Sequence, residues 1–207
     1  MIIERLTVGP IECNCYVVGC SDTKEGVIID PGGDAADIAA TVKKHGLDIK
    51  YILCTHGHFD HIEGMSDLTK TVKAPICISE KDLALYDGIQ EQGKLFGMNL
   101  DAVPKIDILL HDGDELAFGK FKIKVIATPG HTQGGVCFLI DESLFCGDTL
   151  FEYSIGRTDL PGGSFSEIIK SIKEKIFVLN ENVRAYPGHG EATTIGVEKR
   201  FNPYVKS

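Results

Sequence analysis

T-H-G-H-F-D-H, residues 55–61, places three histidines and one aspartate within six positions, as His56, His58, Asp60 and His61. The stretch follows a short apolar run that is predicted to be a buried strand. Residues two apart in an extended segment face the same way, so His56 and His58 can converge on one ion. If a helix begins near Asp60, the turn there presents Asp60 and His61 to a second ion nearby. Imidazole and carboxylate groups are the usual ligands of zinc, iron and manganese.

Three further candidate ligands stand in matching places farther along the chain. Each follows a predicted strand and a turn that glycine or proline makes sharp: His131 after Pro129-Gly130, Asp148 after Gly147, and His189 after Pro187-Gly188. Catalytic groups concentrate on loops that rigid strand ends hold in place. We therefore expect these three side chains to join the cluster at residues 55–61.

A structural role is the alternative to metal binding. A single histidine is more often a surface or hydrogen-bonded residue than a ligand, so His131, Asp148 or His189 alone would be a weak indication. Four such side chains in six positions are different, because buried imidazoles at that density need a cation or an elaborate hydrogen-bond network. Five of the seven histidines in the chain fall in the candidate set. His111, beside Asp112, is expected in a surface turn.

The 207 residues, 43% of them hydrophobic, are enough for one sizeable core, so a single domain over residues 1–207 is expected. Alternating or continuous apolar patterns predict strands near 2–8, 13–19, 26–30, 51–54, 75–78, 114–118, 121–127, 134–140, 143–147 and 183–186. Helices are predicted at 34–45, 60–69, 164–179 and 195–201, with residues 82–103 as a short helix and an irregular excursion. Asp34 is the expected N-cap of the first helix, and S-F-S-E at 164–167 is a capping box. Strands followed by a helix, occurring twice, suit a two-sheet α/β core with helices on both outer faces.

Composition narrows the class of partner and the compartment. A net charge of −9 disfavours nucleic acid, because phosphate backbones demand clustered Lys and Arg. The N-terminus lacks the pattern of a signal peptide, and no apolar run approaches a membrane span. Seven scattered cysteines, an odd number, indicate a reducing, cytoplasmic setting. Composition does not indicate an oligomeric state.

Four sequence strings together resemble the metallo-β-lactamase superfamily. They are T-H-G-H-F-D-H at 55–61, P-G-H-T at 129–132, C-G-D-T-L-F at 146–151 and P-G-H-G-E-A-T-T at 187–194. Within that superfamily the chain is similar, end to end, to the short bacterial glyoxalase II-like proteins, which are homologues of hydroxyacylglutathione hydrolase. The resemblance extends to Asn14-Cys15-Tyr16 and Asp30-Pro31-Gly32. It implies an α/β fold of the αββα four-layer sandwich type, with metals at one edge between the sheets.

The resemblance also implies roles for individual residues. His56, His58 and His131 would hold one divalent metal, Asp60, His61 and His189 a second, and Asp148 would bridge them. Zinc is the expected ion, with iron or manganese as alternatives. A metal-bound hydroxide would attack the carbonyl carbon of a small-molecule 2-hydroxyacyl thioester, with Asp60 and Asp148 as catalytic residues.

Substrate contacts are predicted from two segments. Tyr153 and Arg157, just beyond Asp148, are candidates for contact with the substrate. The alternative for Arg157, which we favour slightly, is a structural ion pair with a nearby Asp. Phe96 and Met98 are candidates for an apolar entrance, against ordinary packing in the core.

Departures from the resemblance leave other functions open. Classical glyoxalase II carries a helical C-terminal domain that helps to grip glutathione, and because about 18 residues follow His189 that domain is expected to be absent. One alternative is a persulfide dioxygenase with a single iron. A β-lactamase is disfavoured, since such enzymes typically place Cys where Asp148 stands. A metal-stabilised binding module is also disfavoured, because a structural metal site is closed by four ligands.

Overall fold

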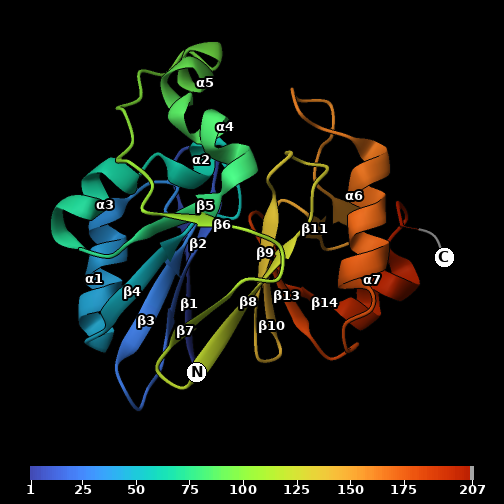
Figure 1. The fold of residues 1–207 in the computed structure, drawn as a ribbon, viewed down its shortest axis with the longest axis horizontal. Helices are drawn as coiled ribbons and strands as arrows, with labels where there is room; N and C mark the ends of the chain where they lie inside the picture. Colours follow the sequence, from blue (N-terminus) through green and yellow to red (C-terminus); the bar gives the residue numbers. More distant parts are fainter. Residues whose placement is uncertain (206–207) are drawn as a thin grey trace.

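Two six-stranded sheets face each other at the centre of the computed structural model, which describes residues 1–205 (Figure 1). The first sheet has the order β1 (Ile2–Val8), β2 (Cys13–Gly19), β3 (Glu25–Ile29), β4 (Asp48–Leu53), β5 (Ile76–Ser79) and β6 (Ile108–Leu110). The second has the order β14 (Thr193–Thr194), β13 (Arg184–Pro187), β10 (Ser143–Gly147), β9 (Val136–Ile140), β8 (Phe121–Ala127) and β7 (Glu115–Phe118). A small hairpin pairs β11 (Leu150–Phe151) with β12 (Ser154–Ile155).

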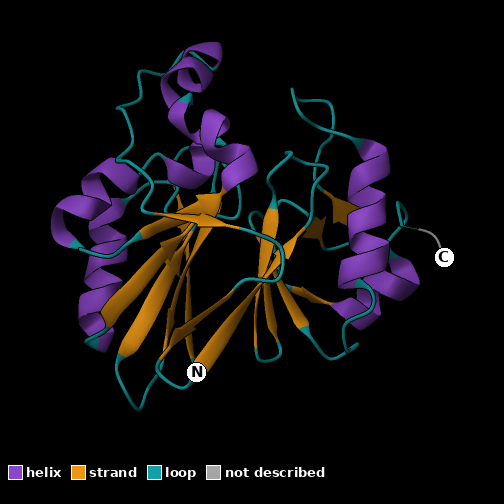
Figure 2. Cartoon of the chain, viewed as in Figure 1, coloured by secondary structure: helices purple, strands orange, loops and turns teal. Residues whose placement is uncertain are grey.

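Helices cover the outer face of each sheet, which completes four layers (Figure 2). On the first sheet lie α1 (Ala35–His45) and α3 (Met65–Thr71), and on the second lie α6 (Phe165–Ser171), the π-helical η2 (Ile172–Ile176) and α7 (Ile195–Phe201). The short helices α2 (Phe59–Ile62), η1 (Glu80–Asp82), α4 (Leu83–Asp87) and α5 (Ile89–Leu95) stand at one end of the sheets. The predicted αββα sandwich is confirmed.

Side chains of the central strands alternate between two apolar layers. Val17 belongs to the layer that contains the residues of α1 and α3, whereas Val18 belongs to the layer between the sheets. In the second sheet Phe145 points into that same middle layer, and Leu144 belongs to the layer under α6. Both faces of these strands are therefore buried, which explains their nearly continuous apolar sequences.

Aromatic contacts join the two sheets close to the strand that precedes His189. The ring of Tyr16, on β2, lies edge-on to Phe145 of β10 at 5.2 Å and to Tyr186 of β13 at 5.7 Å. Its hydroxyl donates a hydrogen bond of 2.7 Å to the backbone oxygen of Pro187. A buried tyrosine hydroxyl usually needs such a partner. Because Tyr16 lies on β2 and Pro187 ends β13, this bond also holds the end of β13 against the first sheet.

Some sequence predictions need correction. Asp34 stands at the N-cap position of α1, but its side chain does not cap the helix and instead accepts a hydrogen bond of 2.9 Å from the Gly9 N–H. The helix predicted at 60–69 is two helices, because Gly64 packs so closely on Pro31 that a Cβ there would lie 2.8 Å from the Pro31 oxygen. Strands β6, β11, β12 and β14, of two or three residues each, are too short to be predicted from pattern.

The second half of the capping box also differs from the prediction. Ser164 caps α6 by accepting from the Glu167 N–H at 3.3 Å, as expected. The Ser164 N–H, however, donates to the backbone oxygen of Gly130 rather than to Glu167. That bond ties the start of α6 to the loop that carries His131.

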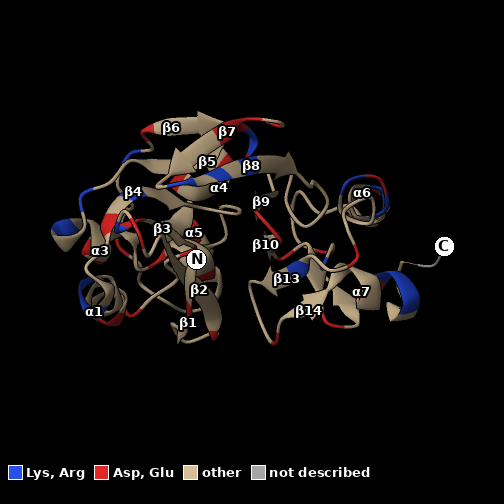
Figure 3. Cartoon of the chain, turned by 90° about the horizontal axis from the view of Figure 1, so that it is seen from below, with Lys and Arg blue, Asp and Glu red and all other residues tan. Residues whose placement is uncertain are grey.

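Surface charge is dispersed. In Figure 3, Lys and Arg are scattered over the outer helices and strand edges, with acidic residues among them. A search of residues 1–205 finds no helix with the length and apolar character that crossing a membrane requires.

Phe145→Ala tests the inter-sheet packing. Removing this fully buried ring leaves a cavity against Tyr16 and Tyr186, so we expect the free energy of unfolding to fall by about 3–5 kcal/mol. Urea unfolding followed by circular dichroism measures the change. Val178→Ala, at a side chain that is 70% exposed, is the control and should change stability by less than about 0.5 kcal/mol. Equal losses in both variants would show that this contact does not stabilise the sandwich.

Candidate metal centre

Seven predicted ligands converge at one edge of the sandwich, each from a segment that follows a strand. His56, His58 and His131 bring ring nitrogens within 4.8 Å of one another, which is the predicted first ligand set. His56, His61 and Asp148 form an overlapping group by the same measure. Strand β4 leads to the first of these loops, and β8, β10 and β13 lead to the loops of His131, Asp148 and His189.

The predicted second set lies beside the first. Nε2 of His189 is 3.2 Å from Oδ2 of Asp60, and Nε2 of His61 is 3.8 Å from the same oxygen. Asp148 stands between the two sets, since Oδ1 is 3.4 Å from Nε2 of His61 and Oδ2 is 3.6 Å from Nε2 of His131. Oδ2 also lies 3.9 Å from Nε2 of His189, so this carboxylate is close to ligands of both sets, which suits it to the predicted bridging role.

Three atoms in this cluster are buried without a hydrogen-bond partner among the described residues. They are Nε2 of His56, Nε2 of His61 and Oδ1 of Asp148. Buried polar atoms without partners are costly and uncommon. These three belong to side chains whose ligand atoms lie within 4.8 Å of one another, so a cation placed among them would satisfy all three. The residues therefore fit divalent metal binding.

The protonation states of His56, His58 and Asp148 favour ligation. Burial lowers the pKa of His56 well below its usual value, and burial together with His131 lowers the pKa of His58 to about 4. Burial alone would raise the pKa of Asp148, but the facing imidazoles of His61 and His131 hold it below its usual range. At neutral pH the two imidazoles have free lone pairs and the carboxylate is ionised, as metal ligands require.

The second ring nitrogen of three ligand histidines is held by a neighbour. Nδ1 of His131 is 2.8 Å from the Arg157 backbone oxygen, and Nδ1 of His189 is 3.2 Å from that of Glu12. Such outer partners fix ring orientation and tautomer. They leave Nε2 of each ring directed at the cluster.

Asp30 holds the third of these rings, His61. Its Oδ2 is 3.0 Å from His61 Nδ1 and 2.6 Å from the hydroxyl of Thr55, which donates to it, while Oδ1 accepts from the Thr55 N–H at 2.7 Å. Apart from its place in the family resemblance, no role was predicted for Asp30 from the sequence. The sequence feature that could have indicated its role is a carboxylate directly after a buried strand and before Pro31-Gly32.

Asp82 is a second buried carboxylate that the sequence did not single out. Its Oδ2 accepts from the Gly57 N–H at 3.1 Å and from the Thr132 hydroxyl at 2.7 Å, and its Oδ1 accepts from the Gly134 N–H at 2.6 Å. Gly57 lies between His56 and His58, and Thr132 follows His131. Asp82 therefore fastens together the two loops of the first ligand set.

Gly188 lies so close to two of the predicted ligands that no side chain fits at its position. A Cβ on Gly188 would lie 2.3 Å from Oδ1 of Asp148 and 2.5 Å from Cε1 of His61. A side chain at this position would push the ligands apart. The P-G-H string at 187–189 thus needs its glycine for packing against the cluster.

Cysteine is not required for this centre. Cys13 Sγ lies 3.5 Å from Nδ1 of His61, and Cys13, His61 and His189 form a further possible ligand group. Nδ1 of His61 is, however, already engaged by Asp30. Burial also raises the pKa of Cys13 to about 12, which keeps it a thiol. All seven cysteines of the chain are buried and free.

A cavity of about 550 Å³ opens onto the cluster, with His58, Asp60, His131, Asp148 and His189 in its lining. Phe96 lines it, which is the entrance alternative, whereas Met98 packs against the core behind the first sheet, which is the core-packing alternative. Arg157 lines it too, but forms a two-bonded ion pair with Asp159 at 2.9 and 2.7 Å, so the ion-pair alternative is confirmed. Tyr153 is half-exposed and outside the lining, and its contact with a substrate stays a prediction.

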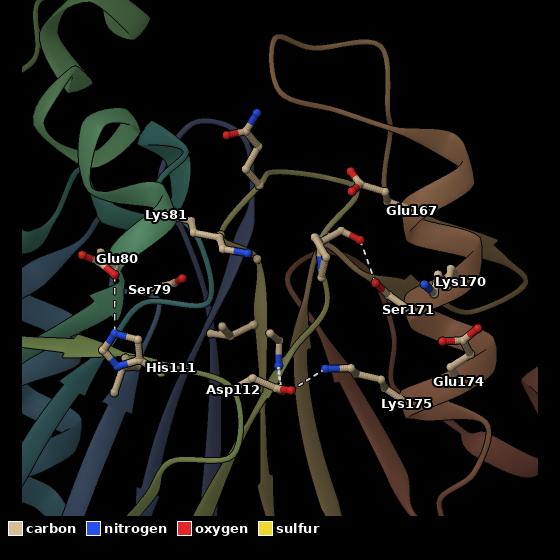
Figure 4. Close-up of a pocket in the computed structure, with 17 residues that line it drawn as sticks. Ser79, Glu80, Lys81, His111, Asp112, Glu167, Lys170, Ser171, Glu174 and Lys175 are labelled. Atoms are coloured by element: carbon tan, nitrogen blue, oxygen red, sulfur yellow. Dashed lines mark hydrogen bonds and ion pairs between the residues drawn. The ribbon is translucent and has the colours of Figure 1, made fainter.

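A second cavity, of about 370 Å³, lies behind the His131 loop and is lined by none of the seven candidate ligands (Figure 4). Two ion pairs lie in its lining. Lys175 contacts Asp112 at 2.6 Å, and His111 lies 3.5 Å from Glu80. His111 is exposed, as predicted. The chemistry of the site is therefore placed in the first cavity.

Comparison with known proteins agrees with this geometry. The family model of the metallo-β-lactamase superfamily matches residues 8–189. Hydroxyacylglutathione hydrolase GloC of Haemophilus influenzae is 37% identical over 211 residues, covering 100% of this chain and 99% of that protein. The structure of the B3 metallo-β-lactamase BLEG-1 is similar with a TM-score of 0.93, at 37% identity and full coverage of both chains. The di-iron-bound form of TTHA1623 gives a TM-score of 0.88 at 34% identity, over 97% of this chain and 99% of that one.

Asp148→Ala tests the bridging assignment. Removing the carboxylate between the two ligand sets should lower metal content from about two ions per chain and abolish turnover. Elemental analysis of the purified protein measures the first effect, and a hydrolysis assay measures the second. Glu152→Ala, an exposed acidic residue four positions on, is the control. Full activity with two metals in Asp148→Ala would show that the assignment is wrong.

Asp82→Asn tests the link between the two loops. An amide cannot accept hydrogen bonds through both of its terminal atoms, so at least one of the three donors loses its acceptor. We expect metal affinity, measured by competition with a chelator, to fall about 10- to 100-fold while the fold is retained by circular dichroism. Asp87→Asn, exposed on the adjacent helix, should bind metal as the unmodified protein does. Unchanged affinity in Asp82→Asn would exclude a positioning role.

Proposed function

Because the chain belongs to the metallo-β-lactamase superfamily, whose members include metal-dependent hydrolases, we propose that it cleaves a 2-hydroxyacyl thioester with two divalent metals. The observation that carries the proposal is the set of unpartnered atoms on His56, His61 and Asp148, in a cluster that opens into the 550 Å³ cavity. A structural metal site is closed, whereas this one faces a space large enough for a small molecule.

Each metal would take ligands from one of the two sets described above. His56, His58 and His131 would hold the first ion and Asp60, His61 and His189 the second, with Asp148 shared between them. Zinc is the proposed ion and iron the main alternative, since the similar TTHA1623 structure is a di-iron form. When bound, a pair of such ions lowers the pKa of water to about 7 and polarises a carbonyl group.

The residues of this chain position the reactants. Asp60 Oδ2 lies between His61 and His189, where a carboxylate can orient the attacking water. In the hydrolysis, the water oxygen bonds to the carbonyl carbon, the carbon–sulfur bond breaks, and the released thiolate takes up a proton. The products are a 2-hydroxy acid and a free thiol.

Relatives with different activities define the competing functions. The similarity to hydroxyacylglutathione hydrolase GloC supports thioester hydrolysis as the activity of this chain. The BLEG-1 structure is described as a β-lactamase and is as similar in sequence, so the sequence argument from Asp148 alone does not separate the two activities. A persulfide dioxygenase with one iron is the remaining alternative.

Metal analysis and three parallel assays test the proposal. The purified protein is analysed for metal identity and number, then assayed with S-lactoylglutathione, with a β-lactam, and for oxygen uptake with glutathione persulfide. About two metals per chain and thioester hydrolysis as the fastest reaction are expected. A single iron with oxygen uptake, or faster turnover of the β-lactam, would contradict the proposal. Activity of the metal-loaded protein against none of the three would also contradict it.

A further inference from the structure

The wall of the active-site cavity away from the metal cluster is apolar. Nine lining residues form it: Ile11, Phe59, Leu85, Leu95, Phe96, Phe151, Ile155, Leu160 and Pro161. At its mouth, Leu95 is 84% exposed and Phe96 is 54% exposed, both at the end of α5. Large apolar side chains gathered at a cavity mouth mark a binding surface.

Few polar groups of this lining are available to a substrate. Apart from the five predicted metal ligands, the polar lining residues are Gln92, Ser154 and Arg157. The Gln92 amide is fully engaged, because it accepts from the Phe59 N–H and donates to two backbone oxygens. Of the described lining residues, the Ser154 side chain and the ion-paired Arg157 remain.

The cavity wall away from the metal cluster offers few cationic partners to an anionic carrier. Glutathione has two carboxylates, and a site that recognises them needs matching cations. Among residues 1–205, Arg157 is the one Lys or Arg in the lining, and its guanidinium already donates twice to Asp159. Even with that ion pair open, a single guanidinium would match only one of the two carboxylates.

We infer that the thiol carrier of the substrate is uncharged and apolar, and that it packs against the wall formed by Ile11, Leu95, Phe96 and Leu160. The inference rests on the thioester hydrolysis proposed above and names the class of thioester. Each methylene of the carrier that the wall buries should raise kcat/KM about fourfold, up to the limit of the cavity. A carboxylate placed there would lose hydration without gaining a partner.

Three lactoyl thioesters test the inference on the metal-loaded protein. Their thiols are glutathione, the small uncharged N-acetylcysteamine, and the apolar benzyl mercaptan, and each rate is corrected for spontaneous alkaline hydrolysis. We expect kcat/KM for the benzyl thioester to exceed that for the glutathione thioester at least tenfold. N-acetylcysteamine separates the effect of charge from that of apolar contact and should fall between the two.

Two variants test whether the apolar wall causes the preference for the benzyl thioester over the glutathione thioester. Phe96→Ala should reduce the ratio of benzyl to glutathione kcat/KM about fivefold, mainly through KM of the benzyl thioester. Phe165→Ala removes an equally exposed ring, 55% against 54%, that lies outside this cavity, and should leave the ratio unchanged.

The outcomes distinguish this inference from the proposed function. Equal or better turnover of the glutathione thioester would overturn the inference while thioester hydrolysis stands. An unchanged ratio in Phe96→Ala would likewise overturn it, because the wall would not contact the carrier. Turnover of none of the three thioesters would overturn the proposed function and the inference with it.

Discussion

Imidazole and carboxylate groups are buried together at one edge of the sandwich, and the arrangement of the surrounding loops follows from the cost of burying them. Nε2 of His56, Nε2 of His61 and Oδ1 of Asp148 are removed from water without a partner among the described residues. Such groups are costly unless a cation satisfies them. Folding of this edge and metal binding are therefore expected to be coupled, so that the ions stabilise the loops that hold them.

Two buried carboxylates outside the ligand set make that edge rigid. Asp30, at the end of β3, fastens Thr55 and His61, and Asp82, beside α4, fastens the loops of Gly57 and Thr132. Each reaches across segments far apart in the sequence. Ligands carried on loops need this support, because small displacements of supporting groups lower metal affinity and activity.

The metal cluster and the cavity wall determine different properties. The metal cluster supports hydrolysis as the reaction class, whereas selection of the molecule that is cleaved is the role we propose for the apolar wall. A hydroxyacylglutathione hydrolase and a structure described as a β-lactamase are both 37% identical to this chain. Function resides in the site rather than in the fold, and here the apolar residues of α5 and the 151–161 segment distinguish the site.

The four-layer class, most of the longer strands and the seven side chains that converge at the edge could be predicted from the sequence. The signals for them are local: strand alternation, Pro-Gly turns and dense histidines. The contacts of Asp30 and Asp82, the break at Gly64, the packing of Met98 and the ion pair of Arg157 could be seen only in the folded chain. Most of these depend on which segments meet across the fold, and short-range patterns in the chain carry no information about such contacts.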